Sequence, residues 1–224
     1  MVKPTNAKSS NRVPVTRERA VVSAIALADS DGLPALTMRK LAEALGIEAM
    51  SLYHHVANKE ELLDGMIDSV FSEIELPPRD VDWKAGMHRR SNSVRAVLLR
   101  HPWAIGVMES RVSPGPWILR HHDAVLGCLR NGGFSVPMSA HAFALIDSYV
   151  YGFVLQEVNL PFTDGDTIGE LVEEIMPQMS IEGYPHLIEL TVEHILKPGY
   201  RFGDEFAFGL NLILDGLGRA ARSG

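Results

Sequence analysis

Apolar residues recur at intervals of three and four positions along nearly the whole chain, and no segment alternates apolar and polar residues as a half-buried strand does. The chain also lacks the glycine fingerprint of a dinucleotide-binding fold and any repeat of short period. The pattern therefore predicts an all-α protein, with an N-terminal three-helix head followed by a larger helical body.

The predicted helices are separated by segments rich in glycine and proline. They are Arg17–Ser30, Thr37–Leu45, Glu48–Val56, Lys59–Ile74, Trp83–Arg100, Trp103–Glu109, Trp117–Arg130, Pro137–Asn159, Thr167–Met179, Pro185–Leu196 and Gly203–Arg219. Pro77 and Pro78 stop the helix that begins at Lys59, because proline lacks the backbone donor that a helix interior needs. We place a domain boundary there, with the head and its connecting helix in residues 1–75 and the body in residues 76–224.

Two of the predicted helices, Thr37–Leu45 and Glu48–Val56, are short and flank one glycine. Gly46 can adopt the left-handed conformation that ends a helix. Leu52 and Val56 lie four residues apart and are expected to face inward, which turns most of their neighbours outward. Two short helices joined in this way make a helix-turn-helix, whose second helix enters the major groove in DNA-binding proteins.

Helix caps support these bounds. Thr37 and Asn58 carry side-chain oxygens suited to an N-cap, and Glu61 follows Asn58 by three residues, as in a capping box. The next helix therefore begins at Lys59, whose ammonium group lies beside a helix N-terminus. That position attracts phosphate.

The outward side chains of the helix pair suit contact with DNA. Ser51 and His54 can donate to or accept from base edges, and Ala49 and Met50 offer apolar contact to a thymine methyl group. The candidate DNA contacts are Arg17, Thr37, Met38, Arg39, Ala49, Met50, Ser51, Tyr53, His54, His55 and Lys59.

The run from Thr37 to Leu63 resembles the DNA-binding head of the tetracycline-repressor (TetR) family nearly position by position. The family's L-Y-x-H-(V/F)-x-x-K core is present here as Leu52, Tyr53, His55, Val56 and Lys59. The similarity is strong over residues 16–71 and extends over the rest of the chain only as a pattern. It implies an all-helical, homodimeric transcriptional regulator, usually a repressor, that binds an inverted-repeat operator and is released by a small-molecule effector.

Helix pairs with a glycine turn also occur in proteins that never bind DNA. Spacing alone therefore leaves two functions open: a DNA-binding regulator, and a helical small-molecule-binding or protein-interaction module. The distribution of charge favours the first. The whole chain has a net charge of −7, but residues 1–60 hold eight basic and six acidic residues, or +2, which leaves −9 for residues 61–224. A basic head on an acidic body is expected if only the head meets phosphate.

Composition bounds the class of protein further. A length of 224 residues with 46% hydrophobic content suffices for one large or two modest domains. The single cysteine, Cys128, excludes an internal disulfide and is interpreted as a small buried hydrophobe.

The first residues resemble no signal peptide, and the most apolar stretch, Ala140–Leu155, is interrupted by Asp147, so we expect a cytoplasmic protein that does not span a membrane. No catalytic sequence signature is present, so we do not expect an enzyme.

The body is the expected site of an effector, in a pocket with mostly apolar walls and a few polar groups. The candidate contacts are Trp103, Met108, Trp117, His122, Tyr149, Phe153 and Gln156. An aromatic residue at helical spacing belongs to the core more often than to a pocket, so each of them taken singly is weak support. Tyr149, Gln156 and the nearby Asp147 are suggestive because they put polar groups into an otherwise apolar helix, and buried polar groups require partners.

Metal ligands are a separate question. Tetracycline-binding members of the TetR family hold a drug–metal chelate through histidines, and the corresponding positions here fall near Glu75 and Met108. We therefore expect a different effector, bound without a metal or any other cofactor. One predicted helix places four candidate ligands near one face, which could hold a divalent cation, although a solvated face explains the pattern as well. They are His186, Glu189, Glu193 and His194.

Two body segments, Ala140–Leu155 and Gly203–Arg219, are apolar on more than one side and so can pack on two sides. In the TetR family the corresponding helices form the four-helix interface of a homodimer. Burial within a single chain explains the same pattern. The residues alone leave both interpretations open.

Overall fold

The computed structural model of the protein describes residues 14–78, 80–108, 110, 113–160, 172 and 183–223. Within this part of the chain every regular element is helical and no strand occurs. The predicted all-α class is therefore confirmed. The helix expected at Thr167–Met179 lies outside the described residues, apart from Val172.

The head consists of short helices that begin where the capping residues indicate. Its elements are α1 (Arg17–Asp31), a 3-10 turn (Leu33–Ala35), α2 (Met38–Leu45) and α3 (Ala49–Leu52), after which α4 (Lys59–Ser72) leads into the body. The side chains of Thr16, Thr37 and Asn58 each accept a hydrogen bond from a backbone N–H in the first turn that follows. α1 packs against both α2 and α4, and α2 packs against α3.

The second helix of the pair is shorter than its predicted extent. α3 ends at Leu52, and the chain continues in turns in which the N–H groups of His54 and His55 donate to the carbonyls three positions earlier, at 3.3 and 2.9 Å. Tyrosine, histidine and valine, which fill residues 53–56, have lower helix propensity than alanine or leucine. Val56 is buried, so the turns bring the chain back to the core before the Asn58 cap.

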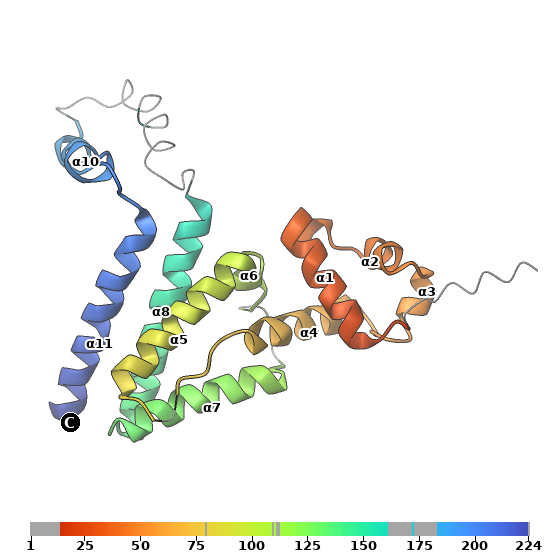
Figure 1. Cartoon of the computed structure of the whole chain (residues 1–224), viewed down its shortest axis with the longest axis horizontal. Coiled ribbons are helices and arrows are strands. Elements are labelled where there is room, and N and C mark those ends of the chain that lie inside the picture. The colour runs from red at the N-terminus through yellow and green to blue at the C-terminus, as the bar shows by residue number, and fades with distance from the viewer. Residues whose placement is uncertain are drawn as a thin grey trace, which may run out of the picture.

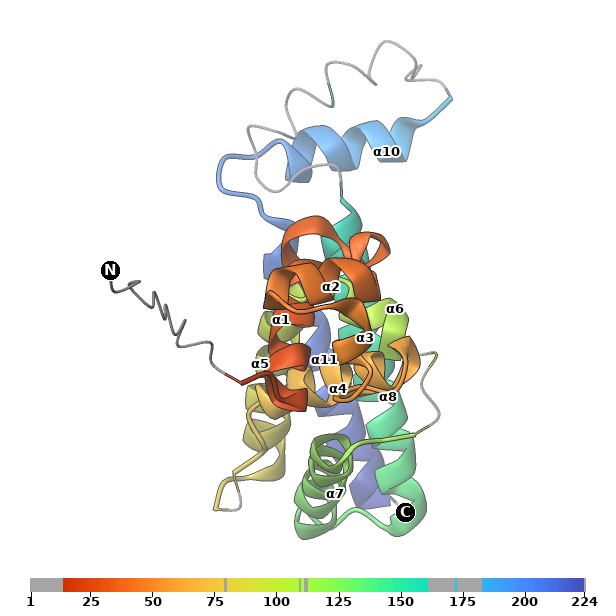
Figure 2. The same cartoon turned by 90° about the vertical axis from the view of Figure 1, so that its right-hand side faces the viewer.

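The body is built around one long central helix. Its elements are α5 (Trp83–Arg100), α6 (Ala104–Met108), α7 (Pro116–Asn131), α8 (Val136–Asn159), α10 (Pro185–Leu190), a π-helical turn (Thr191–Ile195), a 3-10 turn (Phe202–Asp204) and α11 (Glu205–Ser223). α8 packs on α5, α7 and α11, and α4 reaches the body by packing on α7. The head lies at one end of the molecule and α11 at the other (Figure 1). α10 stands beyond the ends of α8 and α11 in both views (Figures 1 and 2).

α8 and α11 pack closely on each other within the chain. At Gly209 an added Cβ would come within 2.3 Å of the Tyr149 hydroxyl oxygen, and that hydroxyl donates to the carbonyl of Phe206 at 2.9 Å. The faces turned toward each other bury Phe153, Phe206 and their neighbours. The intrachain interpretation thus accounts for the apolar residues on these inner faces.

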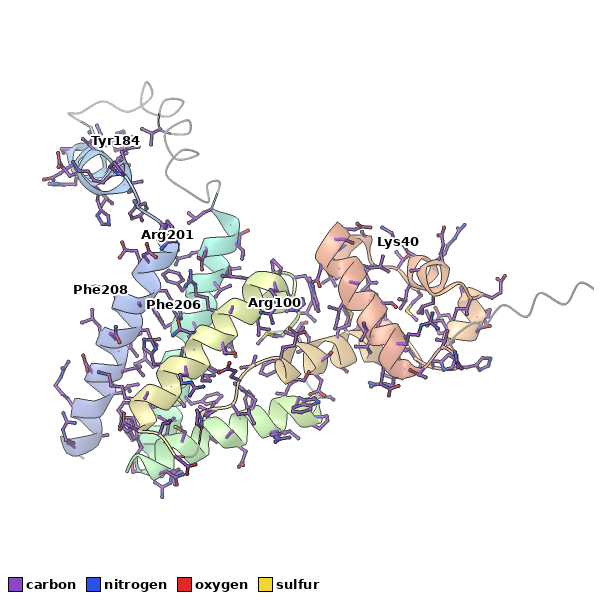
Figure 3. The ribbon with its side chains drawn as sticks, in the orientation of Figure 1. Lys40, Arg100, Tyr184, Arg201, Phe206 and Phe208 are labelled. Atoms are coloured by element: carbon purple, nitrogen blue, oxygen red, sulfur yellow. The ribbon has the colours of Figure 1, made fainter. Side chains whose placement is uncertain are left out.

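The outer faces of the same two helices remain apolar as well. Phe208 is 66% exposed although Phe206, two residues earlier, is 1% exposed (Figure 3). Leu212 follows Phe208 by one turn of α11, and α8 exposes Leu145 and Leu155. Exposed apolar residues therefore remain on both helices outside their contact with each other.

Among the described residues, α8 is also the helix whose length and mean hydropathy of 1.2 would suffice to cross a bilayer. Its position as a packed central helix, with the buried and ion-paired Asp147 in its middle, accounts for that apolar character. A single such helix is weak support for a membrane span.

Candidate functional site

The two short helices of the head meet at Gly46, whose φ of 70° and ψ of 33° are left-handed. Its N–H group donates to the carbonyls of Ala42 and Glu43, and the N–H of Ile47 donates to Ala42 at 3.0 Å. Side chains with a Cβ are strained in this conformation, so glycine fixes the angle between the helices. The turn predicted at this position is confirmed.

α3 presents a mixed polar and apolar surface to solvent. Leu52 is fully buried and holds the helix on the core of the head, whereas Met50 is 75% and Tyr53 44% exposed. Ser51 and His54 are exposed as well. Together with α2, α3 lies at the outer end of the head, away from the body (Figures 1 and 2). We call Met50, Ser51, Tyr53 and His54 the α3 surface.

Other candidate contacts shape the head rather than projecting from it. Met38 and Ala49 are half-buried and pack against the core, and His55 is half-buried. The Thr37 hydroxyl caps α2 by accepting from a backbone N–H at 3.1 Å. Arg39, by contrast, is exposed near the start of α2.

Two cations lie near the N-terminus of α4. Lys59 Nζ donates to the carbonyl of Leu36 at 2.9 Å, which ties α4 to the segment before α2. Arg17 Nε donates to Glu61 Oε1 at 3.2 Å. Glu61 also accepts from the N–H of Ala57 at 2.8 Å, and this bond first, with Arg17 second, lowers the pKa of its carboxyl group. An ammonium group has three donors, so Lys59 keeps two after its bond to Leu36.

The body contains a cavity of about 820 Å³ between α4, α6, α7 and α8. It is lined by Ile67, Phe71, Ile105, Met108, Pro114, Ile118, His122, Phe143, Ala144, Asp147, Ser148, Tyr151, Gly152 and Leu155. Most of these side chains are apolar, and the polar ones come from α7 and α8. Size and composition are those of a small-molecule site.

Two of the seven candidate effector contacts, Met108 and His122, line this cavity. The other five lie elsewhere. Trp103 Nε1 donates to Asp29 of the head at 2.7 Å, and Trp117 is 41% exposed beneath the Arg120 guanidinium. Tyr149 and Phe153 face α11, and Gln156 is exposed. Glu75 and Met108 lie near the positions that correspond to the histidine ligands of tetracycline-binding relatives. Glu75, unlike Met108, does not line the cavity.

Helical register explains the misplacement on α8. The predicted Tyr149, Phe153 and Gln156 share one side of the helix, and that side faces α11 or solvent. The cavity instead receives the stripe Phe143, Asp147, Tyr151 and Leu155, four residues apart each time. A polar pair one helical turn apart, within an apolar stripe, is the sequence signal that could have found it.

A buried polar cluster supports the cavity wall. Arg90 of α5 is fully buried, and its Nη1 donates to Asp147 Oδ1. Its Nε donates to His121 Nε2 at 3.1 Å. The Tyr151 hydroxyl donates to Asp147 Oδ2 at 3.4 Å. Three helices, α5, α7 and α8, are joined by this cluster.

Burial sets the protonation states around Arg90. Burial, then the Arg90 charge and then His122, lowers the pKa of His121 to about 3, so its Nε2 is free to accept. Burial is also the main reason that the pKa of His122 is lowered. The pKa of Tyr151 is raised by burial and then by Asp147, which keeps its hydroxyl protonated. At neutral pH the cluster holds one cation, one carboxylate and neutral partners.

α4 connects the cavity to the head. Ile67 and Phe71 of α4 line the cavity. Between them, Asp68 Oδ1 accepts from the N–H groups of Trp117 and Ile118, at 2.8 and 3.1 Å, and so caps the start of α7. A change in the cavity that moves α7 would therefore move the helix that carries the head.

A second contact joins head and body beside α6. His101, almost fully buried, lies between Asp29 of α1, at 2.8 Å, and Glu73 at the end of α4, at 3.3 Å. Trp103 donates to the same Asp29 carboxylate, and Arg100 pairs with Glu73 at 2.6 Å. The residues that follow at once form α6, which supplies Ile105 and Met108 to the cavity.

The candidate metal ligands of the α10 region separate in the structure. His194 Nε2 pairs with Glu205 at 3.0 Å, Glu193 pairs with Lys197 at 3.2 Å, and His186 lies 3.8 Å from Glu189. Across the described ranges, no three histidine, cysteine, aspartate or glutamate side chains converge as a metal site.

Cys128 is half-buried beside Trp83, and burial raises the pKa of its thiol. That environment matches the small hydrophobe expected from the sequence.

Comparison with known proteins assigns both parts of the chain. Residues 21–66 match the family described as bacterial regulatory proteins, tetR family, and residues 76–220 match the tetracyclin repressor-like C-terminal domain. The HTH-type transcriptional repressor DrrR1 of Streptomyces coeruleorubidus is 34% identical over 212 residues, which cover 91% of this chain and 77% of that protein. The class C tetracycline repressor protein of Escherichia coli is 28% identical over 206 residues and 90% of each chain.

A solved structure agrees with these matches. The Streptomyces coelicolor TetR family protein ActR, crystallised in complex with actinorhodin, is 30% identical and superimposes with a TM-score of 0.76. The match covers 93% of this chain and 99% of ActR.

Proposed function

This chain belongs to the TetR family and is a ligand-responsive, DNA-binding transcriptional repressor, and we propose from that premise how it works. The protein binds an inverted-repeat operator as a homodimer through the α3 surface. A small molecule in the cavity between α4, α6, α7 and α8 then favours a state with the heads differently separated, and the operator is released.

The observation that carries the DNA-binding role is the orientation of α3. Leu52 anchors the helix in the head, and Met50, Ser51 and His54 project to solvent at the end remote from the body. Hydroxyl and imidazole groups can be matched to base edges, and a methionine side chain to a thymine methyl group. Arg39 and Lys59 are exposed on the adjoining helices α2 and α4, and phosphate contacts from such cations fix the register of a recognition helix.

The exposed apolar faces of α8 and α11 support the homodimer. Leu145, Phe208 and Leu212 are exposed apolar residues of these helices, which pairing with the same helices of another copy would bury in a four-helix interface. Two heads related by a two-fold axis then reach successive major grooves about 34–36 Å apart.

The effector acts through differential affinity. A ligand releases DNA only if it binds the non-binding state more tightly than the DNA-binding state. Ile67 and Phe71 of α4 line the cavity and Asp68 caps α7, so the ligand and the head share one helix. We place the protein in the cytoplasm and assign it no catalytic activity, in keeping with a family of regulatory proteins.

The function is tested with DNA from beside the protein's own gene, by fluorescence anisotropy against a large excess of non-specific competitor. We expect a specific complex whose stoichiometry is two chains per operator. The double variant Ser51→Ala, His54→Ala should lose that complex. The control Gln156→Ala, an exposed residue of α8, should retain it. Equal affinity of the double variant and the control would remove the α3 surface from the contact.

A further inference from the structure

The cavity wall carries an unusual combination of aromatic surface and a charged oxygen. The His122 ring lies edge-on to Phe71 and to Phe143, with centroid distances of 6.2 and 5.1 Å and interplanar angles near perpendicular, 85° and 86°. These rings and the aliphatic residues beside them favour a ligand with extensive apolar or aromatic surface. Asp147 opens into the same space.

The Asp147 carboxylate has acceptor capacity to spare. Oδ1 accepts from Arg90, and Oδ2 accepts from the Tyr151 hydroxyl at a long 3.4 Å. A carboxylate offers about four lone-pair sites, so roughly half remain for another donor. Because Asp147 lines the cavity, that donor can come from a ligand.

The cation that neutralises Asp147 stands behind the wall. Arg90 is fully buried and is not among the residues that line the cavity. Its Nε is engaged by His121 and its Nη1 by Asp147, whereas its Nη2 is buried without a hydrogen-bond partner. A ligand in the cavity therefore meets the carboxylate and not the guanidinium.

This arrangement selects against charge in the ligand. An anion in the cavity would be placed against the Asp147 carboxylate, while the Arg90 guanidinium stays buried behind the wall and out of its reach. A cation would face an ion pair of zero net charge, and the gain would not repay the loss of its hydration. His122, neutral at pH 7 because burial lowers its pKa, offers one donor and one acceptor to a neutral polar group.

We propose that the effector is an uncharged, largely aromatic molecule bearing a hydroxyl group, and that this hydroxyl donates a hydrogen bond to Asp147. The inference rests on the proposed role of the cavity as the effector site. Asp147 then selects ligands that carry a hydrogen-bond donor, and the apolar walls supply most of the contact area.

Three matched probes test the proposal: 1-hydroxypyrene, 1-methoxypyrene and pyrene-1-carboxylate. They share one aromatic frame and differ in having a donor, an ether without a donor, or a negative charge. Each is titrated into the full-length protein at pH 7 without DNA, and binding is followed by pyrene fluorescence. Hydrogen bonds to a charged acceptor are among the stronger ones, so we expect the hydroxyl probe to bind about tenfold more tightly than the ether. The carboxylate should bind weakest.

A double variant assigns the preference to Asp147. Arg90→Met with Asp147→Leu removes both charges together, so no unpaired charge is left buried. The two apolar side chains fill most of the volume of the residues that they replace. In this variant the hydroxyl and ether probes should bind equally, whereas the control Gln156→Ala should keep the wild-type tenfold difference. Circular dichroism of each variant establishes that it is folded.

Equal binding of the hydroxyl and ether probes to the wild type would overturn the proposal, as would tightest binding of the carboxylate. Failure of all three probes to bind would also overturn it, because the cavity would then not accept an aromatic frame. These titrations contain no DNA, so a protein that fails to bind an operator but prefers the hydroxyl probe contradicts only the proposed function.

Discussion

The α3 surface and the body cavity are built by opposite means. The α3 surface lies on short elements whose bounds are fixed by nearby residues, chiefly Gly46 and the caps at Thr37 and Asn58. Its side chains are exposed and contribute little to the free energy of unfolding. The cavity gathers side chains from four helices between Ile67 and Leu155. Asp147 is part of its wall and is paired with Arg90, which is fully buried behind it.

This difference indicates which substitutions can change function without changing the stability of the fold. Exposed polar groups cost little to change, because solvent replaces their partners. Buried charges cannot be changed singly, because the remaining partner stays in a low-dielectric interior. Substitutions on α3 should thus alter DNA binding alone, while substitutions in the cluster should alter stability first.

The largest effect is expected at the Arg90–Asp147 pair. Asp147→Leu leaves Arg90 buried without its counter-ion and should lower the free energy of unfolding by about 3–5 kcal/mol. The double change Arg90→Met with Asp147→Leu should recover most of that loss. As a control, Asp215→Asn breaks the exposed pair with Lys84 and should cost no more than about 1 kcal/mol. Urea denaturation measures the free energy of unfolding of all three variants. If Asp147→Leu were as stable as Asp215→Asn, the buried pair would not contribute to stability as proposed.

Acid should destabilise the body through His121. The folded pKa of about 3 lies below the ordinary histidine pKa of 6.5, so the unfolded chain binds the proton first as pH falls. The stabilising contribution is complete above pH 6.5 and is lost on acidification toward pH 3, by about 1.4 kcal/mol per pH unit at most. His122, with its lowered pKa, acts in the same direction.

His121→Gln keeps an acceptor for Arg90 but cannot be protonated in this range. Urea unfolding at several pH values between 6.5 and 4.5 should show a flatter dependence in the variant, with a cumulative difference of about 2–3 kcal/mol. Parallel curves for the two proteins would mean that His121 does not carry the effect.

Single substitutions on the α3 surface should affect DNA and little else. Ser51→Ala or His54→Ala should weaken operator binding by about 1–3 kcal/mol if the side chain contacts a base. The free energy of unfolding should change by less than about 0.5 kcal/mol, because both residues are exposed. Operator affinity that stays at the wild-type value in both variants would exclude them as base contacts.

The smallest effect is expected at Lys59. Lys59→Ala should weaken binding to all DNA sequences by a similar few-fold factor and reduce the salt slope by about 1, as for the loss of one phosphate contact. Lys84→Ala removes the same charge from the body and serves as the matched control. A loss confined to one operator sequence would contradict a phosphate role for Lys59.

The same contrast explains how much could be predicted from the sequence. The caps, the Gly46 turn and the inward Leu52 act within a few residues, so the head was predictable apart from the early end of α3. Its family pattern could be recognised for the same reason. The extent of α3 depends on the weak propensities of residues 53–56 and on the burial of Val56, which spacing alone does not reveal.

The cavity could be predicted only in part because it depends on how helices rotate against one another. Met108 and His122 were found from residue type, but the prediction chose the side of α8 that faces α11. The spacing of Met87, Val94 and Val97 puts Arg90 on the apolar face of α5, unlike the exposed Arg89, but it does not reveal which group pairs with the buried charge. Its importance arises from Asp147, which lies on another helix.

Amide hydrogen exchange on the wild-type protein, with and without its operator, tests the central claim most directly. The account predicts added protection in residues 37–59 that is stronger with operator than with non-specific DNA of equal length, and no direct protection of α5 or α7. Protection centred on the body, with the α3 surface exchanging as in the free protein, would contradict it.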